Sequence, residues 1–259
     1  MTLDERRDSI LRDMNAIFDR LEALPEAAWK ATTPCKGWNV RHLAAHLTGT
    51  IPLMEGRLAA IVEQRSGKPQ PTSELPELGP ETPRDELVAG LRERGDALAS
   101  RLASLTEEDV TTALPGPGGF LAQTADLYLT LAASEFAIHL NDLEVALGND
   151  NAPVSPQGVV AIDAIMGSHL AEFAGMAGNT PAMPLSIGLR GSTLKRDLTW
   201  NGESWTNTAW LNGGQTLVSG SDEAISRFIF GRITIDHPLL RVEGDADLAG
   251  QFKTYVPGP

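Results

Sequence analysis

Two histidines and one glutamate are the residues of this sequence best suited to chemistry. Glu135 and His139 stand four residues apart in a run with helical character, and His46 lies in another such run. One helical step of four residues puts two side chains on the same face, about 6 Å apart along the axis. Two imidazoles and one carboxylate bind a divalent metal and leave a coordination position open for a substrate. The spacing therefore favours a metal site, if the helices bring these side chains together.

The same residues permit other interpretations. A Glu and a His on one helical face can form a solvated pair, and His46 can be a hydrogen-bonded core histidine. His42 is a competing ligand, because it lies four residues before His46 and spacing does not exclude it. Cys35, the single cysteine, is a candidate thiol ligand or nucleophile, although such a cysteine more often only packs. Asp142 lies further along the helical face that carries Glu135 and His139. There it would orient an imidazole ligand by a hydrogen bond without binding the metal itself.

Composition limits the class of protein. The chain has 259 residues, which suits one large or two modest domains, and its 42% of hydrophobic residues is enough for a core. Its net charge of −13 disfavours nucleic acid and anionic membranes as partners. A single cysteine excludes an internal disulfide. We find no apolar signal region at the N-terminus and no stretch long enough to span a bilayer, so we expect a cytoplasmic protein.

Helical spacing dominates the first 180 residues. The segment Thr2–Glu5 has the form of a capping box, and Gly148 marks a helix end. Asn39 is placed to cap a helix that contains Pro52, which predicts a kink or break near Thr50. Pro- and Gly-rich segments at 66–81 and 114–119 are expected to be loops. Helices are expected at about 3–24, 39–65, 82–105, 123–147 and 155–175.

The pattern changes near residue 180 to short alternating runs separated by Gly and Asn. Strands are expected at 185–189, 195–200, 204–210, 216–218 and 239–242, with helices at 221–230 and 245–252. We therefore expect a two-domain α+β protein. Residues 1–180 would form a helical bundle and residues 181–259 a small α+β domain.

Taken together, the motifs resemble those of the mycothiol-dependent maleylpyruvate isomerase family. Trp29 and the run 33–41 precede His46 as in the first motif of that family, and the E-x-x-x-H-x-x-D pattern over 135–142 is similar to its second. Two runs within 230–249 resemble the small sterol-carrier-like domain that often follows. The resemblance covers nearly the whole chain. It implies an N-terminal DinB-like four-helix bundle followed by an α+β sterol-carrier-like domain.

The resemblance also implies a site and a cosubstrate. One metal, usually zinc, would be held by His46, Glu135 and His139, and mycothiol, a thiol of actinobacteria, would be the cosubstrate. The metal would stabilise the thiolate, which would add to a cis-enoyl acid and leave after rotation, or remain on the product of a transferase. The family usually has Asp where this chain has His42. Its name covers many proteins that do not act on maleylpyruvate, so the substrate does not carry over.

Either reaction needs a cation to hold a small carboxylated substrate. Arg232 is the first candidate, and Arg57, eleven residues after His46, is the second. Tyr128, seven residues before Glu135, is an acid, a hydrogen-bond donor or a core residue. A second interpretation is a non-catalytic protein that binds a metal or small ligand. A third is a metal-dependent hydrolase of thiol conjugates.

Overall fold

The structure, a computed structural model, describes residues 1–66, 78–113, 124–209 and 214–257. The chain divides into two compact units, Met1–Gly158 and Val159–Pro259. The sequence placed the boundary at residue 180, and the difference is helix α6 (Pro156–Met176). Most of α6 belongs with the second unit, because its polar groups bind to strands of that unit.

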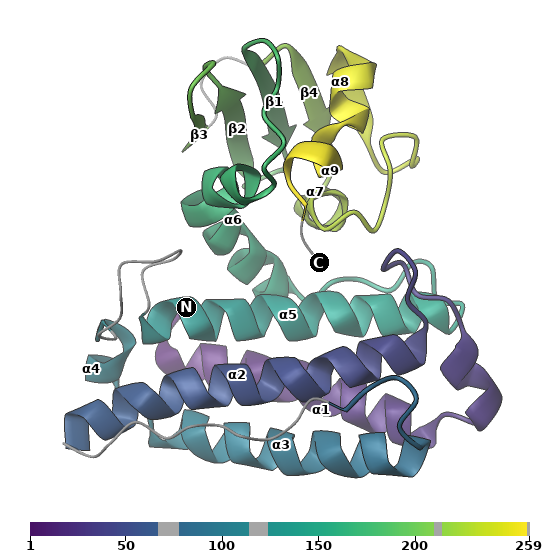
Figure 1. The fold of residues 1–259 in the computed structure, drawn as a ribbon, viewed down its shortest axis with the longest axis vertical. Helices are drawn as coiled ribbons and strands as arrows, with labels where there is room; N and C mark the ends of the chain where they lie inside the picture. The colour runs from purple at the N-terminus through teal and green to yellow at the C-terminus, as the bar shows by residue number, and fades with distance from the viewer. Residues whose placement is uncertain (67–77, 114–123, 210–213, 258–259) are drawn as a thin grey trace. The chain divides into compact units, whose positions relative to one another are not determined.

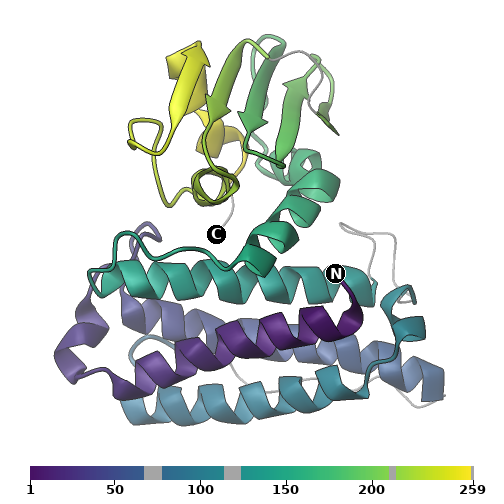
Figure 2. The same ribbon diagram turned by 180° about the vertical axis from the view of Figure 1, so that it is seen from behind.

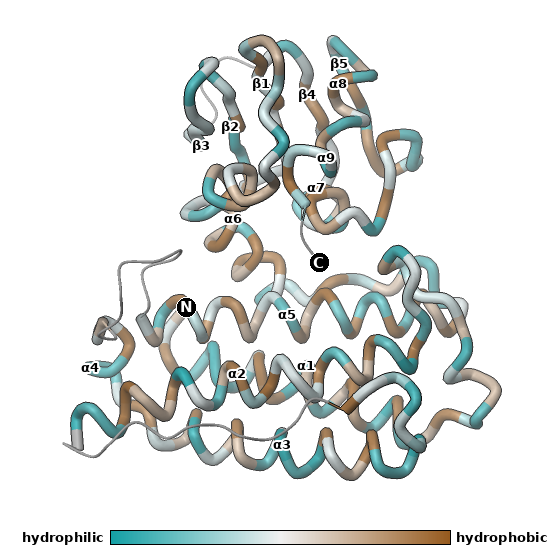
Figure 3. The backbone as a smooth tube through the Cα atoms, in the orientation of Figure 1, coloured by the Kyte–Doolittle hydropathy of each residue, from teal (hydrophilic) through white to brown (hydrophobic). Residues whose placement is uncertain are grey.

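The described residues of the first unit contain four long helices: α1 (Leu3–Ala23), α2 (Val40–Ser66), α3 (Arg84–Ser104) and α5 (Ala125–Ala146). α1 and α2 each contact both α3 and α5, so the four helices close a bundle around one core (Figures 1 and 2). Hydrophobic positions recur along each of these helices (Figure 3). They supply the buried core, as the helical spacing predicted.

Local hydrogen bonds fix several helix ends. The Thr2 hydroxyl accepts from the Glu5 N–H, and the Glu5 carboxylate accepts from the Thr2 N–H, which confirms the capping box. At the start of α2 the Asn39 side chain accepts from the His42 N–H. Gly148, with φ of 89°, follows α5 in the left-handed conformation that glycine adopts easily.

Helix α2 continues through Pro52, so of the kink or break expected near Thr50, the break is wrong and the kink stays a prediction. Proline removes one backbone hydrogen bond and crowds the preceding turn. Packing of α2 against both α3 and α5 holds the helix despite that loss. The Thr50 hydroxyl also donates to the His46 carbonyl one turn earlier, but this bond does not replace the one that Pro52 removes, whose acceptor would be the carbonyl of Thr48.

Two short helices of the first unit lie outside the expected elements. They are the 3-10 helix η1 (Glu26–Lys30) and helix α4 (Glu107–Val110). The loop expected at 114–119 and residues 67–77 of the loop expected at 66–81 lie outside the described residues.

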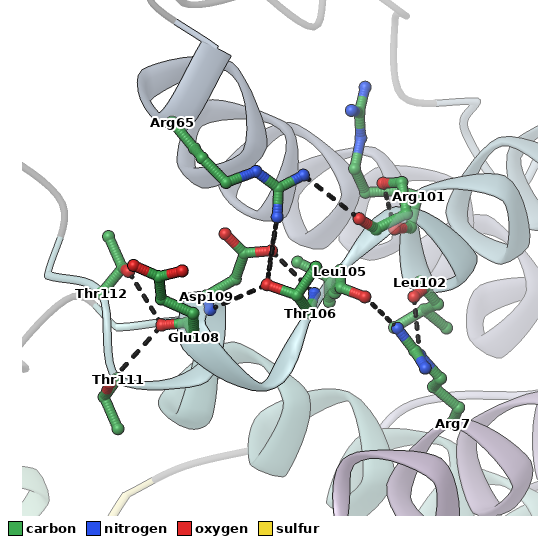
Figure 4. A network of polar contacts seen from close by, with 11 residues as sticks. Arg7, Arg65, Arg101, Leu102, Leu105, Thr106, Glu108, Asp109, Thr111 and Thr112 are labelled. Carbon is green, nitrogen blue, oxygen red and sulfur yellow. Dashed lines mark hydrogen bonds and ion pairs between the residues drawn. The ribbon is translucent and has the colours of Figure 1, made fainter.

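Helix α4 is anchored by the buried carboxylate of Asp109 (Figure 4). One oxygen of this group accepts from the Thr106 N–H at 2.7 Å and from the Thr106 hydroxyl at 2.9 Å. The same oxygen pairs with the guanidinium of Arg65, near the end of α2. The carboxylate therefore caps a helix and ties it to α2 at once.

We expect Asp109→Ala to lower the free energy of unfolding by about 2–3 kcal/mol, because it removes a cap and an ion pair with one buried partner. Asp109→Asn keeps an oxygen for capping and should cost about 1 kcal/mol. Urea denaturation of both variants measures the two values. Equal losses for Ala and Asn would show that the cap contributes little.

The second unit contains a five-stranded mixed sheet in the order β3-β2-β1-β4-β5. β1 and β4 are parallel, and the other neighbours are antiparallel. The strands are β1 (Leu185–Arg190), β2 (Lys195–Trp200), β3 (Trp205–Ala209), β4 (Thr216–Ser219) and β5 (Arg241–Gly244). Helices α7 (Asp222–Ile229), α8 (Ala246–Gly250) and α9 (Phe252–Tyr255) complete the described part. A helical region followed by this sheet confirms the expected α+β fold class.

The last strand and helix differ from expectation. β5 begins two residues later than predicted, because the Leu240 N–H donates to the His237 carbonyl and holds this stretch in a turn. The single helix expected at 245–252 is two short helices, α8 and α9. Trp210, the end of the third expected strand, lies outside the described residues.

Helix α6 is long and apolar enough to cross a membrane by length and composition alone, which corrects the expectation that no stretch is. One such helix is weak evidence for a membrane segment. The Asp163 carboxylate of α6 pairs with Arg196 of β2 at 2.7 Å. The Asn207 amide of β3 donates to the carbonyls of Met166 and Gly167. These polar bonds join α6 to the sheet.

Candidate metal centre

Helices α2 and α5, which contact each other in the bundle, position the three predicted ligands. His46 lies in the second turn of α2, which begins after the Asn39 cap. Glu135 and His139 lie one turn apart on α5, whose first turn is capped by Thr124. Packing of the two helices brings His46 to a pair that is 89 residues away in sequence.

The donor atoms of these residues converge. The Nε2 atom of His46 lies 2.6 Å from Oε1 of Glu135, and Nε2 of His139 lies 3.2 Å from the same oxygen. One ligand atom of each residue lies within 4.8 Å of the other two. The His139 side chain is fully buried, whereas that of His46 is 28% exposed. The site is therefore anchored in the bundle and reachable from the His46 side.

Asp142 supports His139 from the opposite edge of the imidazole ring. Its Oδ2 lies 2.9 Å from Nδ1 of His139, and both side chains are fully buried. The Cys35 thiol lies 3.2 Å from the same carboxylate oxygen and donates to it. A carboxylate on one imidazole nitrogen fixes the proton there and leaves the other nitrogen as a metal ligand.

A second group with ligand spacing shares His139 and consists of Cys35, His139 and Asp142. Its members already bond to one another through the Asp142 carboxylate. By contrast, Nε2 of His139 is buried without a hydrogen bond, because its approach to Glu135 has ion-pair distance but not hydrogen-bond geometry. A buried donor or acceptor without a partner is rare. The unused nitrogen faces Glu135, so the donor set with His46 and Glu135 fits a divalent metal better.

Two further residues contact the imidazoles. The Trp38 ring stacks on His139 at a centroid distance of 6.2 Å and tilts against His46 at 5.0 Å. The Thr50 hydroxyl lies 3.2 Å from Nε2 of His46. Sequence reasoning assigned neither a role, although Thr50 lies four residues after His46, and that spacing could have identified it.

Charges at the site are strongly coupled. Burial disfavours the ionised form of Glu135, but the charge of His139, together with the hydrogen bond and charge of His46, outweighs it and holds the pKa of Glu135 well below its usual range. Burial likewise opposes protonation of His139, but the Glu135 charge and the hydrogen bonds of Asp142 and Cys35 raise the pKa of His139 well above its ordinary value. Without a metal, the pair is therefore a carboxylate and an imidazolium.

His42, the competing ligand, belongs to neither group of described residues with ligand spacing. Its Nδ1 lies 2.7 Å from the Asn39 side-chain oxygen, and the residue is half-buried. This places the His42 ring at the N-terminal cap of α2. The structure thus distinguishes His46, which contacts Glu135, from His42, which sequence spacing did not exclude as a ligand.

The remaining predicted site residues are placed as follows. Arg57 is exposed on α2, and Tyr128 is half-buried on α5. Arg232 belongs to the second unit, where its guanidinium donates to the Phe230 carbonyl and lies over the Phe230 ring. The roles of these three residues stay predictions.

A four-helix bundle with two histidines and a carboxylate converging between two helices, followed by an α+β unit, defines a class of two-unit proteins with a candidate metal site in the bundle. The chain belongs to the mycothiol maleylpyruvate isomerase family, because the family model described as "Mycothiol maleylpyruvate isomerase N-terminal domain" matches residues 11–144. This confirms the resemblance drawn from the motifs. A comparison with curated proteins finds no match.

Solved structures show the same fold. The crystal structure of the mycothiol-dependent maleylpyruvate isomerase has a TM-score of 0.64 and 17% identity, with 94% of this chain and 93% of that chain covered. A histidine-to-alanine mutant of the mycothiol-dependent maleylpyruvate isomerase has a TM-score of 0.61 and 18% identity, with 90% of each chain covered. The similarity therefore extends over both units.

Proposed function

We infer that this protein is a metal-dependent enzyme that uses mycothiol as a nucleophile on a small carboxylated substrate. It would either isomerise a cis double bond or transfer the thiol to the substrate. Membership of the family supports a small thiol and an isomerase. The observation that carries the proposal is the convergence of His46, Glu135 and His139 between α2 and α5.

The described residues fit one divalent metal. His46 and His139 would bind it through Nε2 and Glu135 through its carboxylate. Zinc bound there would supply a Lewis acid that lowers the pKa of a thiol to form thiolate at neutral pH. With a metal bound, the Asp142 carboxylate would hold the proton on Nδ1 of His139 and leave the Nε2 lone pair to bind the ion.

The surroundings of the ligands would orient them and limit water. Trp38 covers one side of both imidazoles and so shields the buried His139 from solvent. The Thr50 hydroxyl can donate to or accept from a group beside Nε2 of His46. Cys35 donates its thiol proton to Asp142, so its assigned role is to support this carboxylate rather than to act as a nucleophile.

In the isomerase, the thiolate sulfur bonds to one alkene carbon and the electron pair moves into the substrate carbonyl system. The remaining single bond rotates, and the carbon–sulfur bond breaks to give the trans acid and the thiolate. In a transferase, the thiolate would instead form a carbon–sulfur bond while the bond to a leaving group breaks or a ring opens, and the displaced group would take the electron pair. Both reactions need the substrate carboxylate to be held by a cation.

Arg232 is our first candidate for that cation. Burial and the charge of Arg232 lower the pKa of Lys253 to about 8, which shows that the two cations lie close together. A carboxylate at this pair would relieve their repulsion. Arg57 is the second candidate, and Tyr128 is proposed as an acid or hydrogen-bond donor on α5.

The proposal is tested on the full chain by measuring bound metal and then titrating mycothiol while ultraviolet absorbance reports thiolate formation. We expect one metal per chain and a thiolate signal that disappears on chelation and returns with zinc. Bound metal without a thiolate signal would instead indicate a binding protein. Cleavage of a thiol conjugate without added mycothiol would indicate the hydrolase.

Metal affinity is expected to rise with pH, by up to about tenfold per pH unit. The pKa of His139 is raised, so in the metal-free protein its proton must leave before Nε2 can bind a metal, and this competition extends above the usual titration range of histidine. The pKa of Glu135 is lowered, so that group stays ionised and adds no dependence near neutrality. Competition with a chromophoric chelator at several pH values measures the slope. A flat profile around neutral pH would contradict the raised pKa.

A further inference from the structure

We propose that the second unit carries a binding site for a small organic cation, an alkylammonium ion, beside the β2–β3 hairpin. A cavity of about 350 Å³ lies between the end of α6, residues 178–180 and this hairpin. Its lining falls entirely within the second unit. Volumes of this size accommodate small ligands. The lining contains none of the residues of the candidate metal centre.

Aromatic rings form one wall of the cavity. Trp200 and Trp205 line it and face each other across the β2–β3 pair, with ring centroids 5.5 Å apart. The Trp205 ring also contacts Tyr255, at 5.6 Å. The whole chain has five Trp and two Tyr, so three of its seven such rings gather here. Tryptophan is the side chain whose ring face attracts a cation most strongly.

The charge of the residues at the cavity favours a positively charged ligand. Glu203, in the hairpin between the two tryptophans, is a lining residue and carries a negative charge. The described lining residues include no Lys or Arg. A carboxylate next to ring faces stabilises an ammonium ion and repels an anion. The net charge of −13 adds a long-range attraction for cations.

The opposite wall of the cavity consists of residues with small side chains or none. Ala171, Ala174 and Gly175 form it at the end of α6. A Cβ atom added at Gly175 would meet no heavy atom within 4 Å, and the same holds at Gly178. The helix thus presents no bulky side chain to the tryptophans, and a larger residue at Gly175 would enter open space.

The proposal is tested with full-length protein and choline as the probe, using NMR signals of the tryptophan indole N–H groups. We expect the signals of Trp200 and Trp205 to shift on titration and those of Trp29 and Trp38 to stay. The uncharged isostere 3,3-dimethylbutan-1-ol has the same shape without the charge. It should bind about tenfold more weakly, which corresponds to the loss of the cation–π attraction. Equal affinity for both probes, or no shift with choline, would overturn the proposal.

Variants separate ligand binding from folding. Gly175→Leu fills the cavity and introduces a better helix former, so the protein should fold while the choline-dependent shifts disappear. Glu203→Gln should weaken choline binding about threefold, because the lost charge is exposed to solvent. Glu172→Gln removes a charge from the same helix outside the lining and should leave the affinity unchanged. Unchanged binding in folded Gly175→Leu protein would show that the cavity is not the site.

Discussion

His46→Ala is expected to remove the metal from the purified protein and to abolish thiolate formation with it. The residue supplies one of three ligands, and its Nε2 lies 2.6 Å from the Glu135 carboxylate that would share the ion. Loss of a group that only supports a ligand typically costs 10–100-fold in metal affinity. Loss of a ligand itself should therefore cost at least about a hundredfold. Metal analysis and chelator competition measure the change.

His42→Ala is the matched control, because it removes the same side chain one turn earlier on α2. Its ring bonds to the Asn39 side chain at the helix cap, so we expect most of the metal to stay bound. Circular dichroism and thermal denaturation would establish that both variants fold. If His42→Ala lost the metal and His46→Ala kept it, the ligand assignment would be wrong.

Asp142→Asn is expected to lower metal affinity by about 10–100-fold without unfolding the bundle. The amide oxygen can still accept from Nδ1 of His139, but it lacks the charge that increases the basicity of the ring. Because the carboxylate is fully buried beside His139, solvent cannot replace it. Chelator competition at fixed pH measures the affinity, and the thermal midpoint reports folding. An unchanged affinity would show that Asp142 has no part in metal binding.

Cys35→Ala distinguishes the two groups with ligand spacing. If the metal is held by His46, Glu135 and His139, this substitution removes only a thiol donor to Asp142, and most of the metal stays bound. If Cys35, His139 and Asp142 held the ion, the same substitution would remove a ligand. Metal lost from folded Cys35→Ala protein would therefore move the site to the second group.

Much of the fold could be predicted, because local interactions decide it. The capping box at Thr2 and the glycine after α5 mark helix ends through hydrogen bonds between near neighbours. Tertiary packing decided the rest. Pro52 stays inside α2 because neighbouring helices hold it, and α4 is too short for any periodicity to show. Helical spacing predicted α6 but not that its Asp163 would bind the sheet and move the boundary.

The site was predictable in part for a similar reason. The spacing of Glu135 and His139 follows from helix geometry, whereas the choice of His46 over His42 as the third ligand rested on the family motif. Sequence spacing did not exclude His42 as a metal ligand. The structure places its ring at the Asn39 side chain, outside both groups of described residues with ligand spacing. Trp38 lies within the first family motif, but ring stacking between two segments leaves no periodic signal in the sequence that would predict its contacts with the imidazoles. Zinc, the substrate anchors and the cytoplasmic location stay predictions.

The junction between the two units falls inside α6 rather than in a loop. A truncation or exchange of the second unit at this point would therefore cut a helix rather than a loop. The sheet would keep its ion pair between Arg196 and Asp163 only if α6 were transferred with it.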